Sequence, residues 1–183
     1  MMDELALGDY LDRAQHELFR LEVLDAYEVA TDGSDFARYL RGEPGPDPAR
    51  KGPWLERLAA DAARGFRNYR VHVLTSPLSD YLRYECEWGY LPNAVAGEDI
   101  RILDLAEKPR PNGLLSEDFW LMDNEAVVLM HYQTGRFTGA EVLSPAVARR
   151  YRAARDTAWQ AAEPFGEYWS AHPQFSRDPD AAA

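Results

Sequence analysis

A strand–helix–strand pattern in the middle of the chain limits the fold more than any other feature of the sequence. Tyr69–Thr75 has the sequence YRVHVLT, whose alternating β-branched residues indicate a strand. Ser76 and Pro77 predict a helix over residues 77–90, because the hydroxyl can accept a free amide and the proline fixes the first helical φ. Asp99–Leu105, DIRILDL, has apolar residues on both faces, as covered parallel strands do. Together these elements predict a right-handed βαβ unit with two parallel strands.

Three more strands are expected after this unit. They are Phe119–Met122, Ala126–Tyr132 and Phe137–Leu143, joined by turns at Asp123–Glu125 and Gln133–Arg136. Turns this short connect antiparallel neighbours. We therefore expect an α/β (α+β) protein whose mixed sheet contains one parallel βαβ unit plus an antiparallel three-strand meander.

Helices are expected at both termini. Apolar residues recur at spacings of three and four over residues 3–18, which favours an amphipathic helix, and a short strand is expected within Phe19–Val29. Ser144 and Pro145 repeat the helix-start pair and predict a helix over residues 145–163.

A proline- and glycine-rich segment lies between the first strand and the βαβ unit. Residues 42–53, GEPGPDPARKGP, contain four prolines and three glycines and predict a long surface loop. Asp32 and Ser34 can cap a short helix before this loop, and a longer helix is expected over residues 54–64 after it.

Length and composition indicate one globular unit. A chain of 183 residues can bury one core, so we expect a single α/β domain over residues 1–175 and a disordered tail over residues 176–183. The one cysteine, Cys86, excludes an internal disulfide. No basic, apolar leader and no apolar run of roughly 20 residues is present, so we expect a cytoplasmic protein without a membrane partner.

The charge balance limits the partners. Thirty-one acidic residues against 20 basic ones give a formal net charge of −11, which repels phosphate backbones. An arginine run over residues 149–155 is typical of a solvated helix face. We expect no direct nucleic-acid binding, and a protein partner, if there is one, should have a basic surface.

One carboxylate is a candidate for a buried site. Glu85 falls on the expected inward face of the helix over residues 77–90, where an unpaired charge would cost several kcal/mol. Arg70 and Arg101, from the two flanking strands, are its natural partners. The cluster is interpreted first as a structural ion pair and alternatively as a ligand-binding group.

The histidines and glycines match no metal or phosphate motif. His72 and His131 lie in two expected strands and could face one side of the sheet, but no third ligand stands at a fitting spacing. Glycine-rich phosphate loops are also absent. We therefore expect no metal and no cofactor.

Long stretches of the sequence resemble a known family. The run RVHVLTSPLSDYLRYECEWGYLPNAVAGEDIRIL, the segments DFWLMDNEAVVLMHY and GRFTGAEVLSP, and both terminal regions are similar to an uncharacterised actinobacterial family of domains of unknown function. Members of that family are often encoded beside Xre-type helix-turn-helix regulators. The resemblance implies a regulatory or toxin–antitoxin role.

A second resemblance is to half of a phospholipase D-like domain. Asp123 stands where that superfamily has its aspartate, but Ser116 and Asp118 replace the histidine nucleophile and the phosphate-binding lysine. This resemblance implies a degenerate copy that binds a ligand and has no phosphodiesterase activity.

Three functions remain open on the sequence alone. The first is a noncatalytic module that binds a protein partner, such as an Xre-type regulator. The second is a small-ligand sensor, and the third is an enzyme or toxin of unrecognised class. A broad aromatic patch would favour the first function, and a deep pocket with converging polar groups would favour the second or third. The candidate ligand-binding residues are Arg70, Glu85, Arg101, Asp123 and His131.

Overall fold

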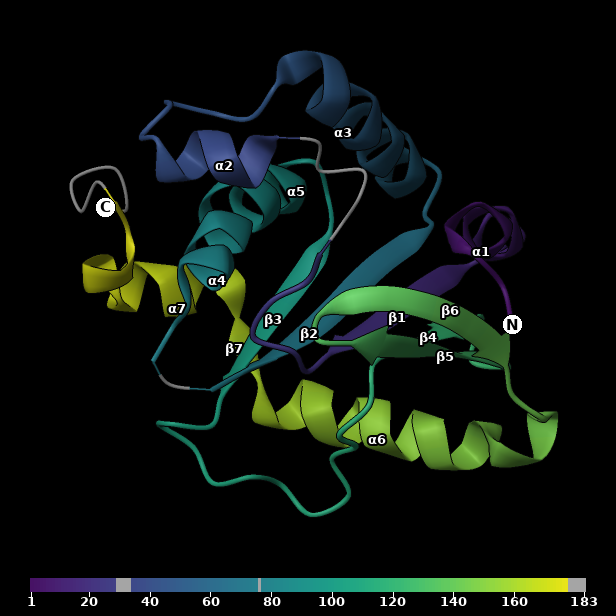
Figure 1. The fold of residues 1–183 in the computed structure, drawn as a ribbon. Coiled ribbons are helices and arrows are strands. Elements are labelled where there is room, and N and C mark those ends of the chain that lie inside the picture. Colours follow the sequence, from purple (N-terminus) through teal and green to yellow (C-terminus); the bar gives the residue numbers. More distant parts are fainter. Residues whose placement is uncertain (29–33, 76, 178–183) are drawn as a thin grey trace.

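A computed structural model describes residues 1–28, 34–75 and 77–177 (Figure 1). The strands are β1 (Glu17–Glu22), β2 (Arg67–Leu74), β3 (Asp99–Asp104), β4 (Phe119–Met122), β5 (Ala126–Gln133), β6 (Arg136–Val142) and β7 (Glu163–Pro164). The α-helices are α1 (Glu4–Leu11), α2 (Asp35–Leu40), α3 (Pro48–Ala63), α4 (Asp80–Tyr84), α5 (Leu91–Val95), α6 (Ala148–Ala161) and α7 (Phe165–Ala171). A π-helical segment, η2 (Glu85–Tyr90), joins α4 to α5, and short 3₁₀ turns lie at η3 (Pro145–Val147) and η4 (Pro173–Phe175).

The described strands form one mixed sheet in the order β6-β5-β4-β1-β2-β3-β7. Strands β2 and β3 are parallel, and β4, β5 and β6 form an antiparallel meander, which confirms the predicted fold class. Strand β1 adds a third parallel strand beside β2, because α2 and α3 form a crossover between them. It also pairs antiparallel with β4 and so joins the two halves of the sheet.

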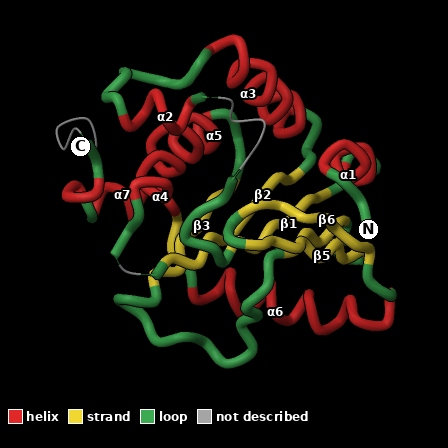
Figure 2. The backbone as a smooth tube through the Cα atoms, in the orientation of Figure 1, coloured by secondary structure: helices red, strands yellow, loops and turns green. Residues whose placement is uncertain are grey.

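Helices cover both faces of the sheet (Figures 1 and 2). Helix α6 lies on one face, where its buried residues pack against Phe19, Tyr69 and Val71. On the other face α1 covers the meander, while α4, η2 and α7 pack over β2 and β3. Because side chains alternate along β2, Arg70 and His72 point to this second face.

Two helix boundaries differ from the prediction. Helix α1 ends at Leu11 instead of continuing to Leu18, because the residues from Glu17 onward pair with β2 and are buried there. Helix α3 begins at Pro48, so the irregular segment is much shorter than residues 42–53. Asp47 makes this earlier start possible, since its side chain accepts a hydrogen bond from the backbone of Ala49.

The helix between β2 and β3 also begins later than predicted. Its N-cap is Ser79, whose hydroxyl accepts from the backbone of Leu82, whereas Ser76 lies outside the described residues, as does Asp32. The helix passes through Pro92 and ends at Val95, beyond the predicted end near residue 90. The wider π-helical turn just before the proline is the kind of irregularity that often occurs at functional sites.

Part of the predicted C-terminal tail is anchored. Arg177 donates to Glu87 and to the carbonyl oxygens of Tyr39 and Glu43, so it ties the chain to α2 and η2. Residues 178–183 lie outside the described part of the chain. Within the described residues, no helix has the length and apolar character that a membrane span needs.

Candidate functional site

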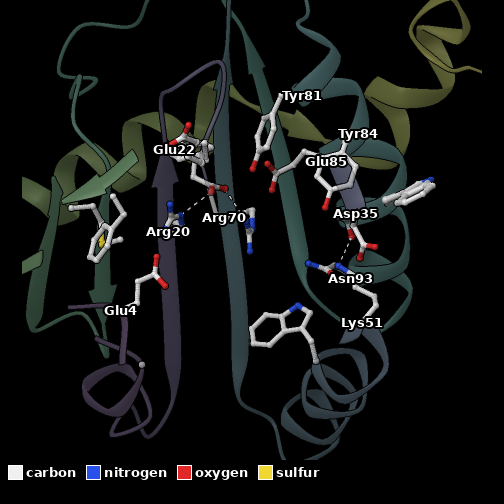
Figure 3. Close-up of a pocket in the computed structure, with 18 of the residues that line it drawn as sticks. Glu4, Arg20, Glu22, Asp35, Lys51, Arg70, Tyr81, Tyr84, Glu85 and Asn93 are labelled. Atoms are coloured by element: carbon white, nitrogen blue, oxygen red, sulfur yellow. Dashed lines mark hydrogen bonds and ion pairs between the residues drawn. The ribbon is translucent and has the colours of Figure 1, made fainter. Parts of the chain in front are cut away.

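A cavity of about 610 Å³ lies on the second face of the sheet, over β1 and β2 (Figure 3). Helix α1 borders it on one side, and α3, α4 and η2 border it on the other. Exposed residues such as Glu4 and Glu28 form part of its lining, so it opens to solvent. Its walls are rich in aromatic rings, among them Tyr27, Trp54, Tyr81, Tyr84, Trp120 and Tyr132.

Two arginines form the floor of this cavity. Arg20 on β1 and Arg70 on β2 are direct register partners in the parallel pair, so both side chains extend from adjacent strands into the same space. Each residue is 8% exposed. Two like charges this close and this deeply buried require acidic partners.

Glu22 supplies the carboxylate between the two arginines. Its Oε2 accepts from Nη1 of Arg70 at 2.8 Å, and its Oε1 lies 2.9 Å from Nε of Arg20 in an ion pair. Burial by itself raises the pKa of Glu22, but the charges of Arg70 and Arg20 outweigh burial and hold the pKa well below its usual range. Glu22 is therefore ionised at neutral pH.

Two more carboxylates complete the network. Nε of Arg70 donates to Glu98 at 2.6 Å, and Asn93 donates to the other oxygen of Glu98 at 2.8 Å. On the opposite side, Asp118 accepts from Nη2 of Arg20 at 3.4 Å and from the hydroxyl of Tyr27 at 2.6 Å. Burial raises the pKa of Asp118, and the Arg20 charge and these hydrogen bonds only partly offset it.

One terminal nitrogen of each guanidinium has no hydrogen bond within the described part of the chain, and Nε of Arg20 contacts Glu22 only as an ion pair. Neither Nη1 of Arg20 nor Nη2 of Arg70 has a hydrogen-bond partner among the described residues, although their other nitrogens contact Glu22, Asp118, Glu98 or Tyr132. Two adjacent N–H groups at the floor of an open cavity can donate to one ligand.

A neutral histidine lies behind the floor. Nε2 of His72 faces the carbonyl of Leu24 at 3.1 Å, and Nδ1 lies 2.6 Å from the hydroxyl of Tyr90. A carbonyl only accepts, so Nε2 carries the hydrogen, and the single hydroxyl hydrogen of Tyr90 is shared between Nδ1 of His72 and Oε2 of Glu22. Burial lowers the pKa of His72, which keeps the ring uncharged at neutral pH. His72 thus fixes the position of Tyr90, which also contacts Glu22.

The structure brings together two of the five predicted site residues. Arg70 and Glu85 both line the cavity. Burial lowers the pKa of Arg70, but the charges of Glu98, Glu22, Tyr90 and Glu85 outweigh burial and raise the pKa.

The other three predicted residues lie elsewhere. Arg101 is on the α6 face, where it donates to the carbonyl of Trp159 at 3.1 Å, so it is not a partner of Glu85. Asp123 caps a chain segment by accepting from three consecutive backbone amides at residues 15–17. His131 contacts Glu141 at 3.0 Å on the α6 side of the sheet. His72 and His131 therefore face opposite sides of the sheet.

The sequence interpretation missed four charged residues of the network, which are Arg20, Glu22, Glu98 and Asp118. A signal existed for the first two, because Arg20 and Glu22 alternate with apolar residues in the segment FRLEV, as expected for one face of a strand. Within the described residues, no group of three or more His, Cys, Asp and Glu side chains is arranged to hold a metal ion.

Removing the Tyr27 hydroxyl should destabilise the protein measurably. Tyr27→Phe leaves Asp118 without its shortest hydrogen bond and the Leu24 amide without an acceptor. We expect the free energy of unfolding to fall by about 1.5–3 kcal/mol, as for hydrogen bonds to charged groups. Urea denaturation measures this, with Tyr10→Phe as the control, since the Tyr10 hydroxyl has no hydrogen bond among the described residues. Equal stability of the two variants would contradict the prediction.

Comparison with known families accounts for most of the chain. The family model described as Domain of unknown function (DUF6879) matches residues 6–170, which include every residue of the arginine–carboxylate network. No curated protein matches the chain.

Proposed function

We propose that this chain, which belongs to the DUF6879 family, is a noncatalytic sensor domain that binds a small molecule in the cavity over β1 and β2. The observation that carries the proposal is the pair of guanidinium nitrogens of Arg20 and Arg70 that face the cavity without a partner among the described residues.

The size and lining of the cavity support this proposal. Its volume of about 610 Å³ falls inside the range of roughly 300–1,000 Å³ that is usual for ligand pockets. Such pockets combine apolar and aromatic walls with a few convergent polar groups. The aromatic walls and the paired arginines match that description.

The energetics of the floor also favour a binding role. A network of buried charges contributes little to the stability of a protein. Replacing such charges by apolar residues of similar volume often leaves the stability unchanged or raises it by about 1–4 kcal/mol. Arg20, Arg70, Glu22, Glu98 and Asp118 are all buried in this network. The charges hold two donors in fixed positions beside the cavity, which is what a ligand site requires.

The predicted role as a partner of a basic protein, such as an Xre-type regulator, is a second candidate. The net charge of −11 favours it. However, each of the five tryptophans is buried or half-buried, so none provides the broad exposed aromatic patch that an interface of this kind would use. A ligand-binding role is the better supported proposal.

The test is a cavity-filling substitution at Gly8. This residue lines the cavity from α1, and a Cβ added there would meet nothing within 4 Å. We expect Gly8→Trp to place its indole in the cavity mouth and to weaken ligand binding at least tenfold. Gly8→Ala is the matched control, because it removes the glycine without filling the mouth and should raise stability by about 0.5–1 kcal/mol.

Binding is measured first as the rise in melting temperature caused by compounds of a broad metabolite library, then by calorimetry on the hits. A ligand at 100 times its Kd stabilises the folded state by about 2.7 kcal/mol. If no compound stabilises the wild type, or if hits bind Gly8→Trp as tightly as Gly8→Ala, the cavity is not a ligand site.

A further inference from the structure

The charges around the cavity differ between its floor and its rim. At the floor, Arg20 and Arg70 offer N–H groups from directly paired strand positions. Figure 3 shows both side chains extending from β1 and β2 toward the same space, with Glu4 on the α1 side.

The rim offers the opposite charge. Glu4 on α1 and Glu28 after β1 are exposed residues that line the cavity, and neither side chain has a hydrogen bond or ion pair among the described residues. Asp35, another acidic residue of the lining, differs from them because it accepts hydrogen bonds from Arg38 and Arg50. Two carboxylates at the mouth are thus available to a cationic group.

The charge balance selects the class of ligand. The lining contains five carboxyl groups and four cationic side chains, so it is nearly neutral. The positive charges of Arg20 and Arg70 are already compensated by Glu22, Glu98 and Asp118. A bare anion would add an uncompensated charge beside three buried carboxylates, and a bare cation would leave the floor donors unused.

The aromatic walls suit the middle of the same ligand. Tyr27 and Trp120 pack against the Arg20 guanidinium, at 5.8 Å and 4.8 Å from its carbon to the ring centroids, and Trp54 lines the cavity from α3. Rings in such positions contact apolar carbon and also attract an ammonium group through their faces.

We infer that the cavity, as the ligand site of the proposed function, binds an aminocarboxylic acid. Its carboxylate accepts from Nη1 of Arg20 and Nη2 of Arg70, and its ammonium group lies toward Glu4 and Glu28. A ligand with both charges leaves the net charge of the site unchanged and uses the donors at the floor and the acceptors at the rim.

Calorimetry on the full chain tests the inference with a defined set of probes. The set contains the common α-amino acids and ω-amino acids of three to six carbons, each beside its N-acetyl derivative, which lacks the cation, and its carboxamide, which lacks the anion. We expect at least one amino acid to bind, and both of its derivatives to bind at least about tenfold more weakly.

Variants at the rim provide a second readout without disturbing the buried network. The double variant Glu4→Gln/Glu28→Gln should weaken binding of the amino acid about tenfold and leave the affinity of the N-acetyl derivative unchanged. Glu56→Gln on α3 is the control, because Glu56 is exposed and does not line the cavity.

The outcomes separate this inference from the proposed function. If no amino acid binds while an uncharged or singly charged library compound binds the wild type and Gly8→Ala but not Gly8→Trp, the ligand class is wrong and the ligand site stands. The ligand class is also wrong if an N-acetyl derivative binds as tightly as its parent amino acid, or if the double variant Glu4→Gln/Glu28→Gln binds the amino acid as tightly as the wild type does. If nothing binds at all, both fail.

Discussion

Replacement of Arg70 by methionine is expected to lower the free energy of unfolding by about 3–5 kcal/mol, the usual result of removing one partner from a buried ion pair. Arg70 contacts Glu22 at 2.8 Å and Glu98 at 2.6 Å, and the side chains of all three residues are at most 10% exposed. Methionine retains much of the apolar stem, so the loss measures the two buried carboxylates left without this cation.

The loss of stability caused by Arg70→Met should be smaller in acid than at neutral pH. The arginines lower the pKa of Glu22, so in the wild type this residue adds stability above its unfolded pKa of about 4.3, and that stability is lost as the pH falls. Without Arg70 the pKa of Glu22 rises, so the carboxyl can be neutralised by protonation at a higher pH. The difference in stability between Arg70→Met and the wild type should therefore be larger at pH 7 than at pH 4.

Urea denaturation at the two pH values measures both effects. Arg57→Met is the control, because Arg57 pairs with Asp12 at the surface, where both side chains are about half exposed, and the change should stay below about 1 kcal/mol. A loss of similar size in the two variants, or a loss for Arg70→Met that does not shrink in acid, would mean that the network is not held together by its charges.

Gly97→Ala is expected to be the second most damaging single change, with a loss on the order of 3 kcal/mol. Gly97 has a φ of +109°, a conformation that side chains disfavour. An added Cβ would lie 2.7 Å from Cβ of Ala62, which belongs to α3 and cannot rotate away. The cost therefore combines backbone strain with a clash between α3 and the turn after α5.

Gly97→Ala should also disturb the charged residues at the floor of the cavity. Gly97 precedes Glu98, so a shift that relieves the contact with α3 moves the carboxylate that holds Arg70. Gly166→Ala on α7 is the control, since a Cβ there meets nothing within 4 Å and alanine favours the helix. Thermal unfolding of the two variants compares them directly, and a Gly97→Ala protein as stable as Gly166→Ala would refute the expected clash.

The elements that the sequence predicted well are those whose signals are local. β2, β3 and the meander follow from alternation within a few residues and from turns such as Asp123–Glu125, so their order and pairing needed no distant contacts. The start of α3 was missed because prolines at positions 48 and 53 suggested a loop, whereas Asp47 caps the helix there.

The spacing of residues in the sequence was not enough to identify most residues of the site. Arg70 and Glu85 were found because they lie on the βαβ unit, but Arg20 reaches the same floor only through the register of β1 on β2. Glu98 follows an irregular connection, so no periodicity predicted its direction. Arg101 was assigned to the wrong face because its strand is covered on both sides and both of its faces are apolar.

The position of β1 has a consequence for the order in which the chain can fold. This strand is synthesised first, yet it pairs with β2 about 50 residues later, Glu17 with Arg67, and with β4 about 104 residues later, Leu18 with Met122. During synthesis it has no neighbour until β2 has emerged, and its second edge stays open until β4 follows. Pairings at such separations slow folding, because the entropy of closing a long loop is lost before the contacts form. Among the described strands, the central one therefore waits longest between its own synthesis and the arrival of its second neighbour, about 104 residues against 61 for the pairing of Ile102 on β3 with Glu163 on β7.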